Sequence, residues 1–301
     1  MSKLLSDTDA FVSWRSLQQQ RVEQALSSWV SADAPADLGV VMRYAVLDGG
    51  KRLRPLLVLA ACEAVQGDAA AALRAACAVE LIHAYSLVHD DMPCMDNDVL
   101  RRGKPTVHVK FGEAQALLAG DALQALAFEL LVPDDGSMGG ALSARLCRQL
   151  ALAAGAAGMA GGQAVDLASV GIALDRPSLE AMHRLKTGAL LQASVMMGVS
   201  TASVEPGVQA RLSAYGAFLG LAFQVVDDIL DVTTDSATLG KTAGKDAAAD
   251  KPTFVSLMGL EAAQAYADQV LDQAHEALSA TALPRTETLH ALADWVGRRV
   301  S

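Results

Sequence analysis

An acidic run stands at the end of a long apolar segment: Val88-His89-Asp90-Asp91-Met92-Pro93-Cys94-Met95-Asp96-Asn97-Asp98. A second acidic run, Gln224-Val225-Val226-Asp227-Asp228-Ile229-Leu230-Asp231, ends another apolar segment. Both segments are predicted to be helices, over residues 70–91 and 208–231. Because the C-terminal end of a helix carries roughly −0.5 elementary charge, carboxylates there repel the helix and one another. We therefore expect the two helix ends to hold a cation.

The spacing inside the first acidic run does not fit one face of a regular helix. Asp96 would lie roughly 240° around an ideal helix from Asp90. Pro93 cannot continue the helix undisturbed, and if Pro93-Cys94 bulges out, Asp96 returns to an effective i+4 relation with Asp90. In the second run the polar side chains stand at i, i+3, i+4 and i+7 and share one helical stripe: Gln224, Asp227, Asp228 and Asp231.

The composition favours an all-α fold. Hydrophobic residues make up 52% of the 301-residue chain but aromatic residues only 4%. Much of the apolar content is alanine, the best helix former, whereas strands favour aromatic and β-branched residues. The chain shows no β period, linker or repeat, so we expect a single domain over residues 1–301. Helices are predicted at 8–30, 38–47, 55–66, 70–91, 112–131, 140–160, 177–198, 208–231, 253–280 and 285–299.

Charge, cysteine content and hydropathy argue against several classes of protein. The net charge of −10 argues against a nucleic-acid-binding surface. The four cysteines form no C-x-x-C pair and no zinc spacing, so we expect reduced thiols, three of them in helices. No window offers about 18 apolar residues free of charges and helix breakers, and residues 1–7 lack a signal-peptide core. These features predict no membrane span and a cytoplasmic location.

Basic residues gather in loops and at helix starts. Because the chain as a whole is acidic, an anionic ligand would need local cations, and helix N-termini strengthen such sites. His83 lies two turns below Asp90 on the same side of the predicted helix, and Thr187 could offer a hydroxyl beside Lys186. The candidate cations for diphosphate oxygens are Lys51, Arg54, Arg101, Arg102, Lys186, Lys241 and Lys251.

Several glycines are predicted to mark close approaches. Gly188 in mid-helix costs about 1 kcal/mol relative to alanine, so we expect a break or a close contact there. Gly161-Gly162 predicts a kink or a close backbone approach. Gly216 and Gly220 precede Gln224 by two turns and one turn, and we expect them to leave that stripe bare and open to a ligand.

These groups fit one type of chemistry. Mg²⁺ takes oxygen ligands, keeps several waters and usually bridges to substrate phosphates. The apolar and glycine-lined stripes below the aspartates predict a dry tunnel for a hydrocarbon. Mg²⁺ would neutralise a diphosphate leaving group at the tunnel mouth, so that its C–O bond ionises where water is excluded. The sequence contains neither a nucleophile elbow nor a P-loop.

An ordered set of motifs resembles the trans-isoprenyl diphosphate synthases of the farnesyl diphosphate synthase type, in their bacterial form. The matching segments run in family order over most of the chain: Gly49-Gly50-Lys51-Arg52-Leu53-Arg54-Pro55, His83 to Asp91 through Arg101-Arg102-Gly103-Lys104-Pro105-Thr106, Gly162-Gln163-Ala164-Val165-Asp166-Leu167, Lys186-Thr187-Gly188, and Phe223 to Asp231.

The resemblance implies a helical bundle around a deep central cavity, usually homodimeric. It implies two to three Mg²⁺ ions, with Mn²⁺ as an alternative, bound by Asp90, Asp91 and Asp96 on one side and by Asp227, Asp228 and Asp231 on the other. It implies that the allylic substrate, dimethylallyl or geranyl diphosphate, is held by Arg101, Lys186, Thr187, Gln224, Lys241 and Lys251. Isopentenyl diphosphate would be held by Lys51, Arg54, His83 and Arg102.

The length of the product depends on the floor of the tunnel. In the resembling family, a bulky residue at the position of Tyr85, together with the Pro93-Cys94 insertion, goes with a C15 product. Ideal helix geometry instead favours Ser86 or Leu87 below Asp90, since Tyr85 lies some 140° away around the helix. Tyr85 and Ser86 are therefore the candidate chain-length residues.

Four other functions remain open on the sequence. A geranylgeranyl diphosphate synthase would share the chemistry with a deeper tunnel. A terpene cyclase would share the metal chemistry, although its second motif usually mixes Asn, Ser or Thr with Glu. A non-catalytic subunit of a heteromeric synthase would not need both acidic runs and every basic segment. An acidic helical protein without a site would leave the helix-end aspartates unexplained.

Overall fold

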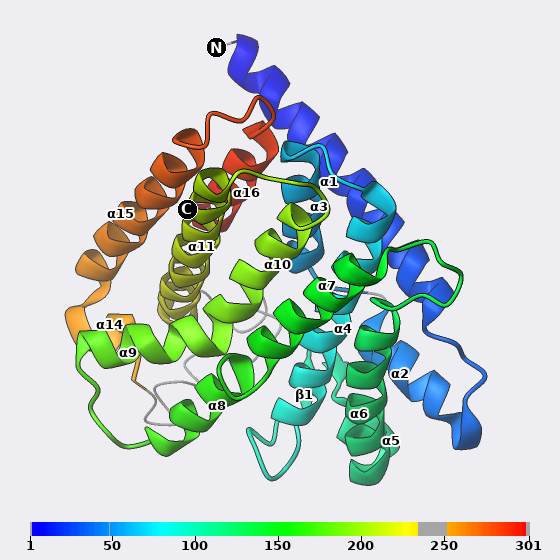
Figure 1. Ribbon diagram of the computed structural model, residues 1–301. Coiled ribbons are helices and arrows are strands. Elements are labelled where there is room, and N and C mark those ends of the chain that lie inside the picture. Colours follow the sequence, from blue (N-terminus) through cyan, green and yellow to red (C-terminus); the bar gives the residue numbers. More distant parts are fainter. Residues whose placement is uncertain (1, 48, 234–251, 299–301) are drawn as a thin grey trace.

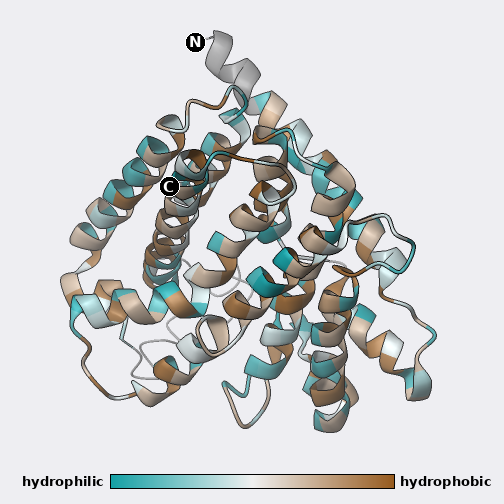
Figure 2. Ribbon diagram, in the orientation of Figure 1, coloured by the Kyte–Doolittle hydropathy of each residue, from teal (hydrophilic) through white to brown (hydrophobic). Residues whose placement is uncertain are grey.

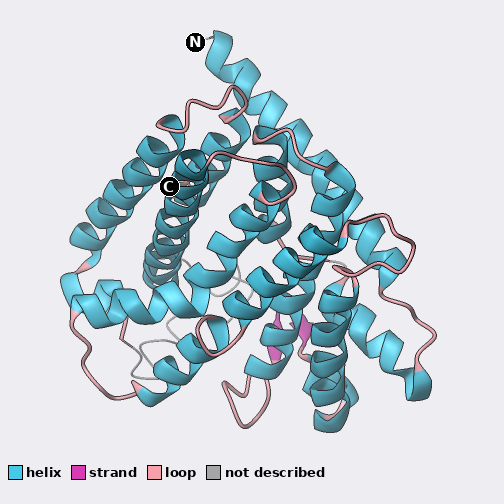
Figure 3. Ribbon diagram, in the orientation of Figure 1, coloured by secondary structure: helices cyan, strands magenta, loops and turns pink. Residues whose placement is uncertain are grey.

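The chain folds as an almost entirely helical molecule (Figure 3), as the composition predicted. The computed structural model describes residues 2–47, 49–233 and 252–298. Its first half contains α1 Ser2–Trp29, the short 3₁₀ helix η1 Pro35–Asp37, α2 Leu38–Val46, α3 Leu53–Ala64, α4 Ala69–Asp90, α5 Val107–Phe111 and α6 Glu113–Glu129. Its second half contains α7 Gly140–Ala154, α8 Met159–Ala168, α9 Arg176–His183, the π-helical segment η2 Arg184–Gly188, α10 Ala189–Val199, α11 Pro206–Thr233, α14 Phe254–Met258, α15 Leu260–Ser279 and α16 Glu287–Gly297.

Several predicted helices are divided in the structure, mostly at glycines. Gly259, at φ 84°, divides the helix predicted over 253–280 into α14 and α15, whereas Gly112, at φ 88°, separates α6 from α5, a short helix that was not predicted. The helix predicted over 140–160 ends at Ala154, and α8 begins only after Gly158. These φ values lie in a region that glycine enters at little cost. A small antiparallel hairpin that the sequence did not predict, β1 Leu100–Arg101 with β2 Lys104–Pro105, follows the first acidic run.

Two apolar clusters form the core. One gathers around α4 and α6, and the other around α11, α10 and α15. Helix α3 packs against both α4 and α10 and joins the two clusters (Figure 1). Hydrophilic colours concentrate on the outward faces of the surrounding helices (Figure 2). The two acidic runs therefore end helices that belong to different halves of the core.

Helix α4 is the central element of the first half. The Asp68 carboxylate caps its N-terminus by accepting from the amides of Ala70 and Ala71, which satisfies donors that the helix itself cannot. By length and composition, α4 is the one helix of the described residues that could cross a membrane. However, 72% of that window is buried inside the molecule, so its apolar character is that of a core helix.

Candidate active site

The first acidic run leaves the helix in the way its spacing predicted. The Asp96 amide donates to the Asp90 carbonyl at 2.9 Å, and the Asp98 amide donates to the Asp91 carbonyl at 3.1 Å. In a regular helix these bonds span four residues, but here they span six and seven. The intervening Pro93-Cys94 segment is looped out, and Asp96 returns to within one turn of Asp90.

Asp90 and Asp96 both line a cavity of about 630 Å³. The pKa of Asp90 is raised to about 6, first by burial and also by the nearby carboxylates of Asp96 and Asp91, while Lys186 and Arg101 act against the rise. A buried carboxylate beside like charges gains most from a bound cation, because a cation favours its charged form.

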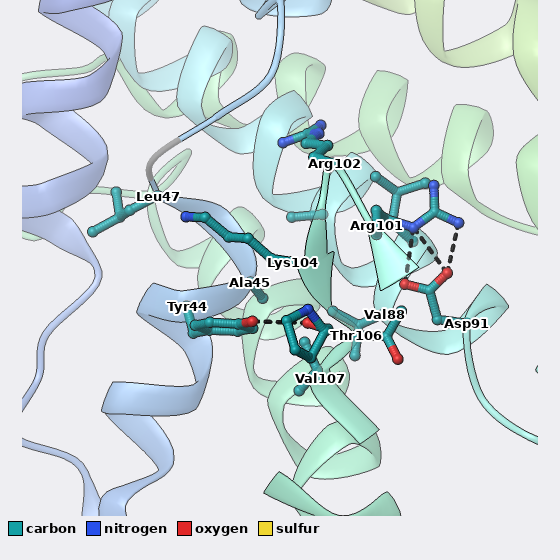
Figure 4. Close-up of a pocket in the computed structure, with 13 residues that line it drawn as sticks. Tyr44, Ala45, Leu47, Val88, Asp91, Arg101, Arg102, Lys104, Thr106 and Val107 are labelled. Carbon is teal, nitrogen blue, oxygen red and sulfur yellow. Dashed lines mark hydrogen bonds and ion pairs between the residues drawn. The ribbon is translucent and has the colours of Figure 1, made fainter. Parts of the chain in front are cut away.

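Asp91 has a different environment, although it was predicted to act beside Asp90. Arg101 holds it in a forked ion pair, with Nε 2.8 Å from each carboxylate oxygen and Nη2 2.6 Å from Oδ1 (Figure 4). Only 3% of Asp91 is exposed, and burial raises its pKa while Arg101 acts against that rise. The sequence did not anticipate this pair, which joins a predicted metal ligand to a predicted diphosphate ligand.

The second acidic run is also divided in its roles. Asp227 and Asp228 both line the cavity, but both oxygens of the buried Asp228 already accept hydrogen bonds. Gln224 Nε2 donates to Oδ1 at 2.8 Å, and the Phe254 amide at the start of α14 donates to Oδ2 at 2.8 Å. Asp231 is 5% exposed and lies outside the cavity lining. Of this run, Asp227 is the carboxylate best placed for a ligand.

The π-helical segment η2 presents Lys186 and Thr187 to the same cavity. Thr187 Oγ1 donates to Gln224 Oε1 at 2.9 Å, and Lys186 Nζ lies 2.6 Å from Asp166 Oδ2. A Cβ built on Gly162 would overlap the Lys186 backbone. The glycine thus lets α8 approach η2 closely, as predicted, and places Asp166 as the counter-ion of Lys186.

The predicted opening beside Gly216 and Gly220 is wrong. A Cβ on Gly220 would lie 2.7 Å from Gly188 Cα, and a Cβ on Gly216 would lie 3.0 Å from Gln192 Cα. These glycines permit close packing of α11 on η2 and α10, so the stripe is filled by another helix. The close contact that we expected at Gly188 is the contact between Gly188 of η2 and Gly220 of α11.

A second cavity of about 500 Å³ adjoins the first and shares Arg54, His83, Arg102 and Phe223 with it. It also contains Gly49, Gly50 and Lys51. Gly50 has φ 97°, and a Cβ there would lie 2.8 Å from the Arg102 guanidinium. The glycine pair therefore makes room for Arg102 beside Lys51.

The buried basic side chains around this second cavity differ in how far they are neutralised. Burial lowers the pKa of Arg54 to about 10, and its buried Nε has no hydrogen-bond partner among the described residues. Burial, together with Arg54 and Arg102, lowers the pKa of His83 well below its usual value. A buried cation without a partner costs free energy, so an anion bound here would relieve that cost. By contrast, Arg52 is fully engaged by Glu80 and Glu23 at 2.6 Å each.

Figure 4 shows residues that line a smaller cavity, among them Tyr44, Lys104 and Thr106. The volume of this cavity is about 60 Å³. Arg101 and Arg102 extend in different directions from the same strand end (Figure 4), Arg101 toward Asp91. This volume is too small for a diphosphate ester, so we place the functional site at the two larger cavities.

The cavity lining includes polar side chains that were not assigned a role from the sequence, among them Gln163, His183 and His89. The amide of Gln163 and both ring nitrogens of His183 are buried without a hydrogen-bond partner in the described chain. Burial lowers the pKa of His183 to about 4. The i, i+3 relation of His183 to Lys186 could have identified it, since both lie on one helical face.

The donor set fits magnesium, although the protein does not preassemble a cage for it. Within the described residues, no three His, Cys, Asp or Glu side chains are grouped closely enough to hold a metal ion. The available carboxylates come singly or in pairs from two helix ends, which suits a hard cation that completes its shell with water and phosphate oxygens. The predicted ligands Lys241 and Lys251 lie outside the described residues.

Comparisons with known proteins identify the family of the chain. The sequence profile of the polyprenyl synthetase family matches residues 36–285. The chain is 51% identical over 282 residues to a probable farnesyl diphosphate synthase of Sinorhizobium fredii, covering 92% of this chain and 84% of that protein. It is 46% identical over 292 residues to the chloroplastic geranylgeranyl pyrophosphate synthase 7 of Arabidopsis thaliana, covering 96% and 84%.

A solved structure also matches the whole fold. The geranyltransferase of Helicobacter pylori, complexed with magnesium and isoprenyl diphosphate, superposes with a TM-score of 0.85 at 35% identity, covering 96% of this chain and 98% of that one. This likeness confirms the predicted all-α bundle, and the relatives confirm the resemblance that the motifs suggested. The chain belongs to the polyprenyl synthetase family.

Proposed function

We propose that this chain condenses isopentenyl diphosphate with dimethylallyl diphosphate and then with geranyl diphosphate, and that the product is farnesyl diphosphate (C15). The observation that carries the proposal is that carboxylates from two chain segments, Asp90 at the end of α4 with Asp96 in the turn that follows and Asp227 on α11, line one cavity together with Lys186 and Arg54. Such a cavity suits a substrate with an anionic head and an apolar tail.

Each diphosphate has its own set of cations. The allylic diphosphate lies beside Lys186 and Thr187, with Arg101, Gln224, Lys241 and Lys251 as further ligands. Isopentenyl diphosphate lies in the adjoining cavity, where its anionic oxygens neutralise Arg54 and Arg102 beside Lys51 and His83. Because the two cavities share Phe223 and Arg54, the reacting ends of the two substrates meet at their junction.

The carboxylates bind two to three Mg²⁺ ions, or Mn²⁺ in their place. We assign Asp90, Asp96 and Asp227 as the main metal ligands, since Arg101 holds Asp91 and hydrogen bonds hold Asp228. When bound, Mg²⁺ neutralises the leaving diphosphate, so that the allylic C–O bond can break.

In this reaction the protein positions the two substrates and excludes water from the reacting atoms. The C–O bond of the allylic diphosphate breaks to give an allylic cation and diphosphate, and the isopentenyl double bond attacks the cation to form the new C–C bond. A proton is then lost to the released diphosphate. Burial at the junction excludes water, which would otherwise trap the cation, and no side-chain nucleophile takes part.

The product spectrum tests the proposal. Purified chain is incubated with labelled isopentenyl diphosphate and either dimethylallyl or geranyl diphosphate, with Mg²⁺ or with a chelator. We expect Mg²⁺-dependent C15 diphosphate from both primers. A C20 main product would instead support a geranylgeranyl diphosphate synthase, which the likeness to the Arabidopsis relative keeps as the second candidate. A cyclic hydrocarbon, or no turnover, would contradict the proposal.

We further propose that the chain acts as a cytoplasmic homodimer. Large apolar side chains stand exposed on α5 and α6, with Val109 at 49%, Leu117 at 47% and Leu118 at 53% exposure. Covering such a face with a second copy would remove apolar surface from water. Light scattering after size-exclusion chromatography should give twice the chain mass of 31.3 kDa.

A further inference from the structure

His89 precedes the first aspartate pair and links the cavity to a neighbouring helix. It lines the 630 Å³ cavity, and its Nε2 donates to the Leu117 carbonyl of α6 at 3.1 Å. The ring fills the space that a side chain at position 120 would need, because a Cβ on Gly120 would overlap Nε2. His89 is thus held in a notch of α6 that Gly120 creates.

Tyr85, one turn earlier on α4, rests against this histidine. The two rings meet edge to face with centroids 5.7 Å apart and an interplanar angle of 77°. The Tyr85 side chain also hydrogen-bonds with Gln124, one turn beyond Gly120 on α6. Two successive aromatic rings of the cavity wall are therefore both attached to α6.

These two rings separate the cavity from α6. Tyr85 and His89 belong to the cavity lining, whereas the lining that the described chain provides includes no residue of α6. A hydrocarbon growing toward α6 must displace one of the rings. Tyr85 can rotate away only if its edge contact with His89 is lost, and His89 can move only by leaving the Gly120 notch.

We propose that His89, seated in the Gly120 notch, is a positioning residue for product length. It holds Tyr85 across the end of the tunnel and does not itself touch the reacting atoms. The inference rests on the proposed prenyl-chain elongation, and it adds that residue 120 on a second helix sets where elongation stops.

Three variants test the inference by their product ratios from dimethylallyl and isopentenyl diphosphates at matched conversion. Gly120→Ala should push the ring out of the notch toward the tunnel and raise the C10:C15 ratio. His89→Ala should free Tyr85 and raise the C20:C15 ratio. Each shift should be about tenfold, since small changes in pocket shape alter discrimination by this order. The double variant His89→Ala with Gly120→Ala has no imidazole ring to displace, so its C10:C15 ratio should not be raised.

The matched control is Gly207→Ala on α11, where a new Cβ meets nothing within 4 Å; its product ratio should equal that of the wild type. His89→Gln keeps an N–H for the Leu117 carbonyl and should give a smaller shift than His89→Ala. If thermal melting shows that Gly120→Ala does not fold, the product ratio of His89→Gln still tests the inference.

Two outcomes overturn the inference while leaving the proposed function intact. One is an active wild type whose product ratios do not change in His89→Ala and Gly120→Ala. The other is a double variant that keeps the shortening of Gly120→Ala, which would show that the effect does not pass through His89. A wild type that makes no prenyl diphosphate would instead refute the proposed function itself.

Discussion

At the scale of single residues, neighbouring aspartates of one motif do different work. Asp90, Asp227 and Asp228 all line the cavity, but both Asp228 oxygens accept hydrogen bonds, one from Gln224 on the same helix and one from the Phe254 amide of α14. Asp91 is held by Arg101. Replacing a carboxylate that binds metal should therefore lower the reaction rate. Replacing a carboxylate that accepts hydrogen bonds within the protein should lower the stability of the fold.

The pair Asp227→Asn and Asp228→Asn separates these roles. Asp227→Asn should lower kcat/KM by about 100-fold or more, since it removes a ligand charge where the leaving group develops charge, with little change in Tm. Asp228→Asn replaces one of two acceptor oxygens by a donor facing an N–H, which should cost about 1–3 kcal/mol of unfolding free energy. Steady-state kinetics and thermal melting of both variants check the contrast, and a larger Tm loss in Asp227→Asn would contradict it.

Tyr85 is the residue that we expect to close the tunnel. Tyr85→Ala should shift the main product from C15 to C20, because it removes the ring that lies between the cavity and α6. Chromatography of the labelled products measures the shift. Unchanged chain length would rule Tyr85 out as the floor and direct attention to Ser86.

At the scale of elements, close helix crossings place the functional groups. The π-helical segment η2 lies against both α8 and α11, with Gly162 and Gly220 at the two contacts. The two close contacts fix η2 in a position where Lys186 and Thr187 both face the cavity. π-Helical segments are uncommon and often occur at functional sites.

Gly220→Ala should test the crossing of α11 with η2. Its Cβ would lie 2.7 Å from Gly188 Cα, and such overpacking costs about 1–3 kcal/mol, against a gain of about 1 kcal/mol in helix propensity. Gly207→Ala, in open space on the same helix, is the matched control. We expect a lower Tm and a raised KM for the allylic substrate only in Gly220→Ala; equal Tm values would show that the crossing is not tight.

Two histidines, His275 on α15 and His290 on α16, contact each other between the last two helices. His275 Nδ1 lies 2.7 Å from His290 Nδ1, and His275 Nε2 lies 3.0 Å from Asp294 Oδ1. Burial and then His275 lower the pKa of His290 below 6.5, while Asp294 and Glu287 oppose the shift. Because the pKa of His290 is lower in the folded protein, the unfolded chain binds more protons than the folded protein once the pH falls below 6.5.

The stability contribution of His290 should therefore be present above about pH 6.5 and be lost as the pH falls below it. In melting curves recorded between about pH 8 and pH 5, His290→Asn should show a weaker fall of Tm at the acid end than the wild type. Parallel curves for the two proteins would contradict this assignment.

At the scale of the whole molecule, the proposed metal ligands are divided between the two halves of the core. The described residues hold no preassembled group of three metal-binding side chains. Metal ions with bound phosphate oxygens would join α4 to α11, and so the two apolar clusters to each other.

Ligand-dependent melting tests this division. Mg²⁺ alone should raise Tm little, whereas Mg²⁺ with inorganic diphosphate should raise it by several degrees, because a ligand stabilises the fold only by binding it more tightly than the unfolded chain. Diphosphate with a chelator serves as the control. An equal rise with Mg²⁺ alone would mean that the carboxylates form a complete site without phosphate.

Features that depend on near neighbours along the chain could be predicted from the sequence. Alanine-rich periodicity indicated the helices, and the Asp90 to Asp96 spacing indicated the looped-out Pro93-Cys94. Only the tertiary structure decided which carboxylate oxygens are occupied, as with Asp228 and the Phe254 amide 26 residues away. It also showed that Gly220 meets another helix and that Gly120 makes room for His89. Helical periodicity records which face a residue occupies, but the partner on that face is set by how distant helices cross.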